Sequence, residues 1–343
     1  MSPTLDKPAE AIWTPLTGLP EGATHWRDDN YETLVEEWRA HVREITDRKK
    51  DKTIVNIWLR ERRRAFAIET GQIEGLYTLK RGVTEQLITE GLKTVVSSHT
   101  LENVDDITIK GLLDDQEIAL NVVSDQVDHN RPLSQFMLMS WHRLLARHQA
   151  TVSSLRVEGG RLQRVQVPFV LKGRYKRYPN NPRRQDGTVH EYCPPEHVQP
   201  EMDRLLYYYW DIEKQHIPTH VEAALLHHRF VRTHPFQDGN GRMSRLLMAY
   251  VYLKRGEIPP IVTAEGKPAY IAALEIADRG NLKPFSDYIG ALATVTMNAA
   301  LVMTQKVLDN HRHIMHGNGG MTKDGKYYPP ETEQDSPDRE PGD

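Results

Sequence analysis

The sequence has a single cysteine, Cys193, among its 343 residues, so no disulfide bond can form within the chain. This shortage fits a reducing compartment, because stable disulfides occur mainly in secreted proteins. Residues 1–13 lack an apolar core and contain two acidic side chains, so we expect no signal peptide. No stretch approaches the ~18 consecutive apolar residues that a membrane-spanning helix needs. The sequence therefore predicts a soluble, cytoplasmic protein without a membrane partner.

An excess of positive charge is also missing. The chain has 44 Lys and Arg against 47 Asp and Glu, a formal net charge of −3. This balance argues against a protein that holds nucleic acid by bulk electrostatics, but it leaves room for a local basic patch. Hydrophobic residues make up 38% and charged residues 27%, which is ordinary for a globular protein. The length allows one large domain or two modest ones.

Apolar residues recur at helical spacing along most of the chain, so the predicted fold class is mainly α. Residues 104–114 resemble a connection between two helices. Thr219 and Glu222 form a capping-box pair, and Gly256 stands where a helix C-terminal cap belongs. The predicted helices are, in chain order, one from about Tyr31, 115–150 with a break at Pro132, 200–215, one from about His220, one from near Asn240, 268–278 and 283–311.

One β-hairpin is predicted at about residues 165–193. Val and Phe residues precede Gly173, and the Asp186-Gly187 dipeptide supplies the positive φ angles of a tight hairpin turn. Because proline cannot donate a ladder hydrogen bond, Pro179 and Pro182 place this hairpin at an edge. Its outbound strand is basic, with Arg174, Lys176, Arg177, Arg183 and Arg184.

The segment from His234 to Arg245 combines several side chains suited to polyphosphate chemistry. Gly239-Asn240-Gly241 at a helix start can present backbone N–H groups to an anion, aided by the helix dipole. Arg242 and Arg245 are i, i+3 neighbours that can clamp further phosphate oxygens. Each residue alone has an ordinary structural explanation, but their coincidence within one short segment favours a site.

Asp238 and His234 add a metal ligand and a base to this segment. Asp238 is a hard oxygen ligand of the kind that binds Mg²⁺ together with phosphates. His234 can deprotonate a hydroxyl group near neutral pH. Together with the anion site, these residues are the parts needed for transfer from a polyphosphate.

The string His-Pro-Phe-Gln-Asp-Gly-Asn-Gly-Arg-Met-Ser-Arg at 234–245 resembles the complete signature of the Fic (filamentation induced by cyclic AMP) family. The hairpin is similar to the Fic flap, which holds a target segment beside the active site. In total the resemblance covers about residues 60–305. It implies a helical bundle with a β-hairpin flap next to the active site, and protein adenylyltransferase activity that moves AMP from ATP to a Tyr, Thr or Ser hydroxyl.

The resemblance also implies roles for individual residues. His234 would be the general base, and Asp238 would bind Mg²⁺, or Mn²⁺, between the α- and β-phosphates. Phe236 would anchor the loop in the core, and Tyr270 would line the nucleotide pocket. Asp278 stands where relatives often carry Asn, a departure that concerns base or ribose contacts. The phosphates would be held by Gly239, Asn240, Gly241, Arg242 and Arg245.

A second motif, Thr70-Gly71-Gln72-Ile73-Glu74-Gly75, resembles the inhibitory signature of one Fic class. There a helix presents the glutamate, here Glu74, to the second arginine of the main motif, here Arg245. The physical reason is that one buried guanidinium cannot serve two anions at full strength. The resemblance therefore implies an autoinhibited enzyme, and in some relatives the same Glu supports removal of AMP, which would make the enzyme bifunctional.

The sequence is also compatible with other functions. One is a Fic enzyme that transfers another phosphate-linked group. Another is a non-enzymatic helical regulator or nucleic-acid-associated protein on a vestigial core, for which the basic run at residues 60–64 and the basic hairpin are the only support. A flap binds main chain by strand addition, so its side chains do not name a target. Expected partners are ATP, a protein target, the chain itself through auto-AMPylation, and by analogy a second copy.

The sequence predicts four parts along the chain. These are an N-terminal extension at 1–52, a helical region with the inhibitory motif at 53–114, the catalytic core at 115–311, and a tail at 312–343. From residue 317 on the tail contains no Leu, Ile or Val and is rich in acidic residues, Pro and Gly, so disorder is predicted for it.

Overall fold

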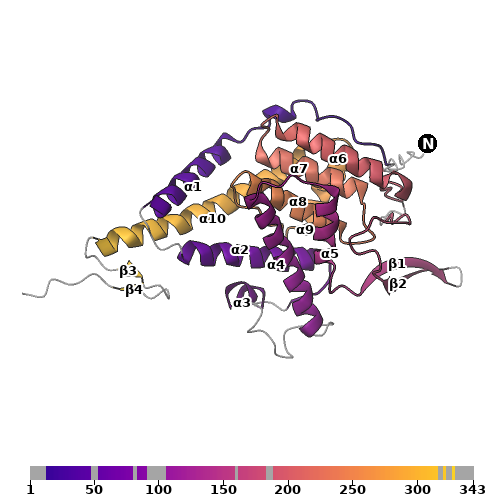
Figure 1. Cartoon of the computed structure of the whole chain (residues 1–343), viewed down its shortest axis with the longest axis horizontal. Coiled ribbons are helices and arrows are strands. Elements are labelled where there is room, and N and C mark those ends of the chain that lie inside the picture. Colours follow the sequence, from indigo (N-terminus) through magenta and orange to yellow (C-terminus); the bar gives the residue numbers. More distant parts are fainter. Residues whose placement is uncertain are drawn as a thin grey trace, which may run out of the picture. The chain divides into compact units, whose positions relative to one another are not determined.

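The computed structural model describes residues 13–47, 53–79, 83–90, 106–158, 161–182, 188–315, 320–321 and 327–328. Within these residues the chain forms ten α-helices and two antiparallel two-stranded sheets (Figure 1). This composition confirms the mainly α fold with a hairpin. The chain divides into two compact units, the first of residues 1–31 and 61–296 and the second of residues 32–60 and 297–343.

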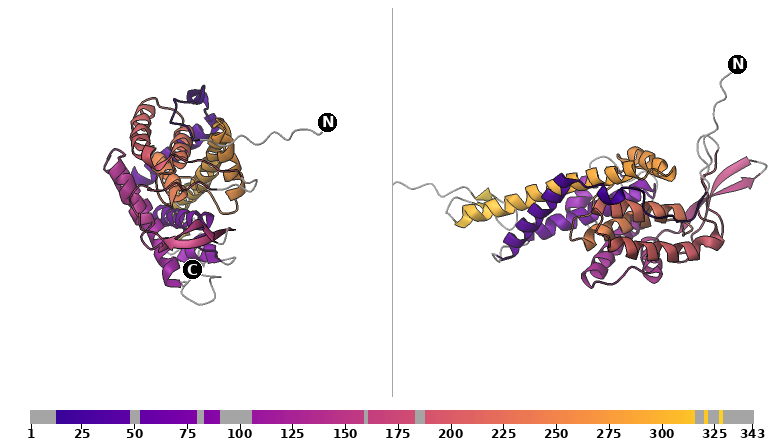
Figure 2. Two further views of the ribbon diagram at one scale, coloured as in Figure 1. Left: turned by 90° about the vertical axis from the view of Figure 1, so that its right-hand side faces the viewer. Right: turned by 90° about the horizontal axis from the view of Figure 1, so that it is seen from above.

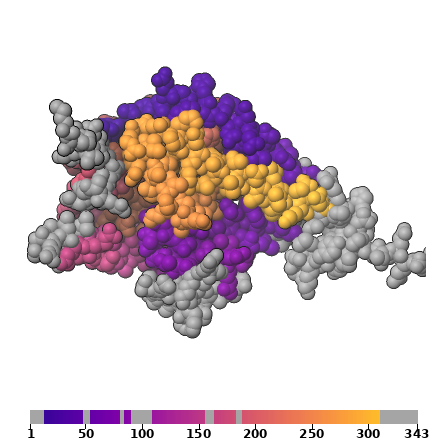
Figure 3. All heavy atoms as spheres, turned by 180° about the vertical axis from the view of Figure 1, so that it is seen from behind, coloured from indigo at the N-terminus to yellow at the C-terminus, as the bar shows by residue number. Residues whose placement is uncertain are grey.

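The first unit holds the motif segments. Its helices and strands are α3 (Val83–Glu90), α4 (Asp106–Asp128), α5 (Gln135–Leu145), β1 (Thr151–Glu158), β2 (Arg161–Pro168), α6 (Val198–Glu213), α7 (Thr219–Thr233), α8 (Asn240–Lys254) and α9 (Lys267–Asp278), with short 3₁₀ turns at Ala23–His25 and Pro195–His197. Helices α1 (Asp29–Asp47), α2 (Thr53–Ile73) and α10 (Lys283–Met315) contribute to both units. In the space-filling view, α9 and the start of α10 form one continuous orange surface (Figure 3).

Helix α8 is the centre of the first unit. Every residue from Arg242 to Tyr252 is buried, so this helix is enclosed on all sides. It packs against α4, α5 and α7. A helix enclosed in this way is held rigidly, and its N-terminus therefore has a fixed place beside the end of α7.

The second unit includes residues of α1 and α10 and the small sheet of β3 (Gly320–Met321) and β4 (Tyr327–Tyr328). Nδ1 of His41 lies 2.8 Å from Oγ1 of Thr304, which joins α1 to α10. By length and apolar composition, residues 283–309 of α10 are the one segment of the described chain that could cross a membrane. Of the apolar 18-residue window within it, 44% is buried inside the protein. Most of the tail for which disorder is predicted lies outside the described residues.

Two local predictions were wrong. Residues 106–114 are not a connection but the first turns of α4, because Ile109, Leu112 and Leu113 pack into a core cluster with Ile68, Tyr77 and Leu87. The capping box also fails. Pro218 is the N-cap of α7, Thr219 donates its hydroxyl hydrogen to Glu257, and Glu222 accepts hydrogen bonds from Arg255. Both side chains therefore bond to residues outside the helix start and do not cap the helix.

Two other local predictions are confirmed. The helices break at Pro132, and α8 ends just before Gly256, which has a φ of 68°.

The hairpin lies at a different place from the predicted one. Strands β1 and β2 pair over residues 151–168, and Glu158 opposite Arg161 leaves a two-residue connection. Figure 2 shows this hairpin projecting from the helices of its unit. Over the predicted range the chain does turn back, since the N–H of His190 bonds to the carbonyl of Pro182 at 3.0 Å, but the Asp186-Gly187 turn lies outside the described residues. The prolines limit pairing there to isolated contacts.

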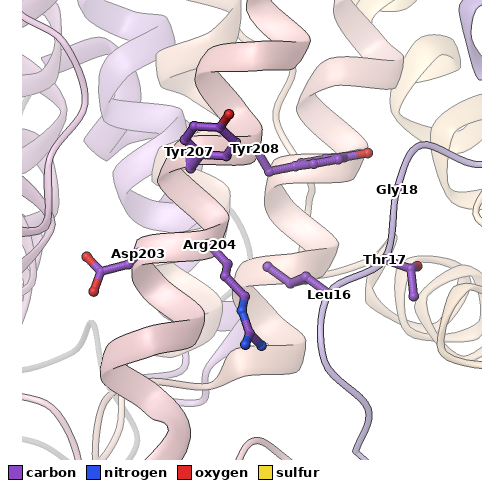
Figure 4. Close-up of a pocket in the computed structure, with 7 residues that line it drawn as sticks. All are labelled: Leu16, Thr17, Gly18, Asp203, Arg204, Tyr207 and Tyr208. Carbon is purple, nitrogen blue, oxygen red and sulfur yellow. The ribbon is translucent and has the colours of Figure 1, made fainter.

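An N-terminal segment covers part of α6. Arg229 donates hydrogen bonds to the carbonyls of Thr17 and Gly18, and the N–H of Leu16 bonds to Glu201. Between this segment and α6 lies a groove of about 430 Å³ (Figure 4). Its lining comprises Leu16, Thr17, Gly18, Asp203, Arg204, Tyr207 and Tyr208.

Candidate active site

The loop between α7 and α8 is locked in place by its own side chains. Phe236 is fully buried and stacks on the ring of His142, with 3.7 Å between ring centroids. This agrees with the predicted anchoring role of Phe236. Asn240 uses its side-chain amide to bond both the N–H and the carbonyl of Phe236, at 2.9 Å each. The Asn240 side chain therefore holds the loop, and only its backbone can face a phosphate.

His234 is presented as a neutral base. It ends α7 in a left-handed conformation, with a φ of 48°. Its Nδ1 lies 3.1 Å from the carbonyl of Val231. Because a carbonyl can only accept, Nδ1 carries the hydrogen and Nε2 keeps its lone pair. Burial, reinforced by the nearby Lys176 ammonium, lowers the pKa of His234 to about 3. The imidazole therefore stays neutral at any ordinary pH, with the Nε2 lone pair unprotonated.

A tyrosine covers one face of this base. The Tyr192 ring lies parallel to the His234 ring, with 3.7 Å between centroids and 9° between planes. The N–H of Tyr192 bonds to Asn181 at 3.0 Å, and the Lys176 ammonium stands 5.9 Å from the centre of its ring. Tyr192 belongs to the segment predicted as the flap, which thus reaches the catalytic loop.

One carboxylate oxygen of Asp238 accepts a hydrogen bond within the protein, and the other can bind a ligand. Its Oδ2 accepts a 2.7 Å hydrogen bond from Gln149, and no described residue bonds to Oδ1. The side chain is 40% exposed. A single accessible carboxylate oxygen fits Mg²⁺ that is shared with phosphates. In the described part of the chain, no group of three or more His, Cys, Asp or Glu side chains could hold a metal by itself.

Arg242 points into the protein. It is 1% exposed and donates to the carbonyl of Leu145 at 3.1 Å and to Oε1 of Gln149 at 2.5 Å. Its Nη2 lies 3.9 Å from Asp238, and none of the described residues forms a hydrogen bond with its Nε. The structure therefore does not bring Arg242 and Arg245 to one clamp as the i, i+3 spacing predicted. A phosphate contact by Arg242 stays a prediction.

Glu74 occupies the anion site at the start of α8. Gly239 is the N-cap of this helix, and the N–H groups of the first turn have no partner within the helix. A Cβ added to Gly241 would collide with Oε1 of Glu74, so the carboxylate lies directly against this backbone. Negative charge at this position is favoured by the helix dipole.

The same carboxylate pairs with Arg245. Oε1 of Glu74 accepts a hydrogen bond of 2.5 Å from Nη2 of Arg245, which is 2% exposed. Thr70, four residues earlier and in the last turn of α2, accepts a hydrogen bond from Nε of Arg245 through its hydroxyl at 2.5 Å. Burial lowers the pKa of Arg245, but Glu74 and Tyr270 outweigh it, so the pKa is raised. Arg245 is thus a fixed cation.

The end of α2 explains the glycine of the second motif. Gly75 has a φ of 67°, and its N–H bonds to the carbonyl of Gln72, while the N–H of Leu76 bonds to the carbonyl of Gly71. This is a Schellman cap, whose left-handed residue is usually glycine. The cap ends the helix at Ile73 and so fixes where Glu74, the next residue, points.

Tyr270 does not line an open pocket. It is 2% exposed, and its hydroxyl lies 2.8 Å from Nε2 of His227, which also contacts the Ser244 hydroxyl at 3.0 Å. Burial lowers the pKa of His227, so this ring is neutral. The cluster supports Arg245 from the protein side, and a nucleotide contact by Tyr270 stays a prediction.

Asp278 joins α9 to α7 and to the flap segment. Its Oδ1 lies 3.0 Å from Nε2 of His228 and 3.7 Å from Nε of Arg232, and its Oδ2 lies 3.7 Å from Nε2 of His190. Burial raises the pKa of Asp278, but His228, His190 and Arg232 outweigh it and hold the pKa below its usual value. The aspartate at this position is therefore part of an ionic cluster.

Sequence reasoning missed two residues that position the motif. The N–H of Gly173 bonds to Nδ1 of His142 at 2.8 Å, so Nε2 of His142 carries a hydrogen, which it donates to the carbonyl of Asp238 at 2.9 Å. Gln149 bridges Asp238 and Arg242. Both lie about 90 residues before the motif in the sequence, and no local pattern marks them.

Comparison with known proteins points to one family. Residues 132–252 match the sequence model of the Fic/DOC family. "Protein adenylyltransferase fic-1" of Caenorhabditis elegans is 35% identical over 95 residues, which is 28% of this chain and 19% of that protein. "Protein adenylyltransferase Fic" of Aedes aegypti is 35% identical over 85 residues, 25% of this chain and 17% of that protein. The matched part thus spans less than a fifth of these relatives.

Solved structures share the fold over a longer stretch. A Fic domain-containing signalling protein from Bacteroides thetaiotaomicron matches with a TM-score of 0.63 at 22% identity, over 80% of this chain and 98% of that one. Fic-1 from C. elegans matches with a TM-score of 0.58 at 20% identity, over 80% of this chain and 71% of that one. At these identities the likeness concerns the fold.

Proposed function

We propose that this chain, whose residues 132–252 match the Fic/DOC family, is a protein adenylyltransferase that moves AMP from ATP to a target hydroxyl. The observation that carries the proposal is the pairing of a neutral base with an anion site. His234 keeps the lone pair of Nε2, and the N-terminus of α8 follows six residues later. These are the requirements for activating a hydroxyl beside a bound phosphate.

In the proposed reaction, Nε2 of His234 takes the proton of a Tyr, Thr or Ser hydroxyl. The oxygen then forms a bond to the α-phosphorus of ATP, the bond from that phosphorus to the bridging oxygen breaks, and pyrophosphate leaves. Backbone N–H groups at Gly239–Gly241 and the guanidinium of Arg245 would stabilise the phosphate charge. When bound at Asp238, Mg²⁺ would neutralise charge on the phosphates, and Mn²⁺ is an alternative.

We further propose that Glu74 restrains this activity. Its carboxylate competes for two phosphate-binding elements at once, the backbone at Gly241 and the Arg245 guanidinium. ATP phosphates can take both only if Glu74 moves away. Removal of AMP by the same site, with Glu74 orienting a water, is a second activity that this placement favours.

The test follows the fate of two labels in ATP. Purified wild type, Glu74→Gly and His234→Ala chains are incubated with Mg²⁺ and ATP labelled at either the α- or the γ-phosphate. We expect the α-label alone to enter protein, most strongly with Glu74→Gly and not with His234→Ala. Intact mass should show gain of an AMP group. Incorporation of the γ-label would instead identify a kinase, and no incorporation by any chain, with lysate proteins present, would reject the transfer.

A further inference from the structure

The segment beside the catalytic loop carries charge of one sign only. Residues 163–182, termed the basic segment, contain five basic and no acidic residues, in a chain whose net charge is −3. Its basic residues are Arg164, Lys172, Arg174, Lys176 and Arg177. Solvated protein surfaces normally mix both signs, because like charges in one segment repel each other. A surface of one sign therefore indicates a partner of the opposite sign.

Three of these charges face solvent without a carboxylate. Arg164, Arg174 and Arg177 are exposed, and no described acidic residue pairs with them. By contrast, Lys176 is buried, and its ammonium group donates a hydrogen bond of 2.8 Å to Oδ1 of Asn180. The exposed guanidinium groups thus contribute little to holding the fold and remain available to a partner.

The basic segment is bonded directly to the catalytic loop. The N–H of Lys176 donates to the carbonyl of Pro235 at 2.8 Å, and Tyr175 forms an isolated β-bridge with Phe236. The N–H of Leu171 bonds to the side chain of Gln237 at 3.3 Å. Arg174 and Arg177 therefore flank the residues that touch the loop carrying His234. A polypeptide whose hydroxyl reaches His234 must come close to them.

Apolar side chains stand exposed beside these charges in the sequence. Tyr178 is 79% exposed and Val170 is 71% exposed. Large exposed aromatic side chains next to arginine are typical of protein interfaces. This mixture of apolar and basic side chains fits a polypeptide partner, and the net charge of −3 disfavours a nucleic acid held by bulk electrostatics.

We propose that the basic segment is the docking surface for an acidic segment of the target protein, next to the hydroxyl that is modified. The inference rests on the proposed function and adds the chemical class of the target. Main-chain pairing in the flap leaves the target sequence open, whereas charge complementarity selects targets and speeds their encounter. The modified Tyr, Thr or Ser would accordingly lie among Asp and Glu residues.

Binding of short peptides tests this proposal without depending on catalysis. The full chain carrying His234→Ala is titrated with two fluorescent peptides of equal length, one with a central Tyr among Glu residues and one with Lys replacing Glu. A single-stranded DNA oligonucleotide is the third probe. The variants are R164S/R174S/R177S and, as matched control, K110S/R131S/R279S, which removes three other exposed basic residues.

We expect the acidic peptide to bind, to weaken with salt, and to lose about tenfold in affinity with R164S/R174S/R177S but not with the control, the order expected for three exposed charge pairs. No binding, equal binding of the basic peptide, or equal loss with the control would overturn the proposal. Tighter binding of DNA, lost with the same variant, would overturn it in favour of nucleic acid. Failure of AMP transfer itself is read separately, from the labelling experiment above.

Discussion

The ring of Tyr192 lies flat on the imidazole of His234, with 3.7 Å between their centroids. One comes from the flap segment and the other from the end of α7, so the flap segment shields the proposed base from water. Burial is the main reason that the pKa of His234 is lowered to about 3. The stacking therefore links the position of the flap segment to the proton affinity of the base.

We predict that Tyr192→Ala raises the pKa of His234 from about 3 towards its ordinary value of about 6.5, because water reaches the ring. Its transfer rate should then fall between pH 7 and pH 5, where the imidazole becomes protonated, while the wild-type ring stays neutral. Tyr192→Phe should behave as wild type. An NMR titration of His234, with rates measured in the Glu74→Gly background, checks this. A pKa that stays near 3 in the Ala variant would contradict it.

Gln149 should control metal affinity through Asp238. Its amide holds Oδ2 at 2.7 Å and leaves Oδ1 for a ligand. We predict that Gln149→Ala weakens the apparent affinity for Mg²⁺ by about tenfold or more, as is typical when a residue that orients a metal ligand is removed. Rates measured against Mg²⁺ concentration give the effect, with the exposed Gln163→Ala as control. An unchanged Mg²⁺ dependence at a reduced maximal rate would instead indicate general damage.

The sequence contained the motif residues but not their supports. Local spacing placed the starts of α7 and α8 and the end of α8, because the helix pattern, the Gly-rich start and the capping glycine are local features. His142 and Gln149 act through the tertiary fold, and a single histidine or glutamine has no spacing signal. The direction of the Arg242 side chain could not be predicted from the sequence for the same reason. It points into the protein because it bonds to Gln149 and Leu145, about 95 residues away.

The hairpin was predicted too late in the chain for a similar reason. Asp186-Gly187 is a strong turn signal, but Pro179 and Pro182 remove ladder donors beside it. The real strands flank Gly159-Gly160, another favoured hairpin dipeptide, with alternating apolar residues on either side. The predicted capping box was wrong for a tertiary reason too. Thr219 bonds to Glu257 and Glu222 bonds to Arg255, so neither side chain bonds to the backbone of the first helical turn.

His142 should make stability depend on pH. Burial lowers its pKa to about 3, whereas an unfolded chain protonates histidine near 6.5. Its depressed pKa means that stability is complete above about pH 6.5 and is lost as the pH falls towards 3. The loss is about 1.4 kcal/mol per pH unit for one proton. Unfolding of the wild type by urea at pH 8 and pH 5 should show this decline.

The matched variant for this prediction is His142→Phe, which keeps a ring on Phe236 but leaves Gly173 N–H and the Asp238 carbonyl without partners. At pH 8 it should be less stable by about 1–3 kcal/mol. Because phenylalanine does not titrate, the difference from wild type should shrink as the pH falls from 6.5. A difference that stays constant between pH 8 and pH 5 would show that His142 does not carry the pH dependence.

The release of Arg245 by mutation of Glu74 is the strongest expected gain. A charge-assisted hydrogen bond of 2.5 Å must break before phosphates can reach the guanidinium. Such a bond contributes about 1.5–3 kcal/mol, so Glu74→Gly should raise AMP incorporation by about 10- to 100-fold. Glu74→Gln keeps the shape of the side chain but loses its charge. Its AMP incorporation should therefore lie between that of the wild type and that of Glu74→Gly.

Two controls separate inhibition from loosening of helix α2. Glu85→Gly removes an exposed carboxylate from α3 and should leave labelling unchanged. Thr70→Val removes the hydroxyl that bonds Nε of Arg245 and keeps Glu74, so it should weaken ATP binding more than it relieves inhibition. Were Thr70→Val to activate as strongly as Glu74→Gly, disorder of α2 would be the cause. Activation confined to the Glu74 variants, graded from Gln to Gly, requires the carboxylate itself to be the competitor of the nucleotide phosphates.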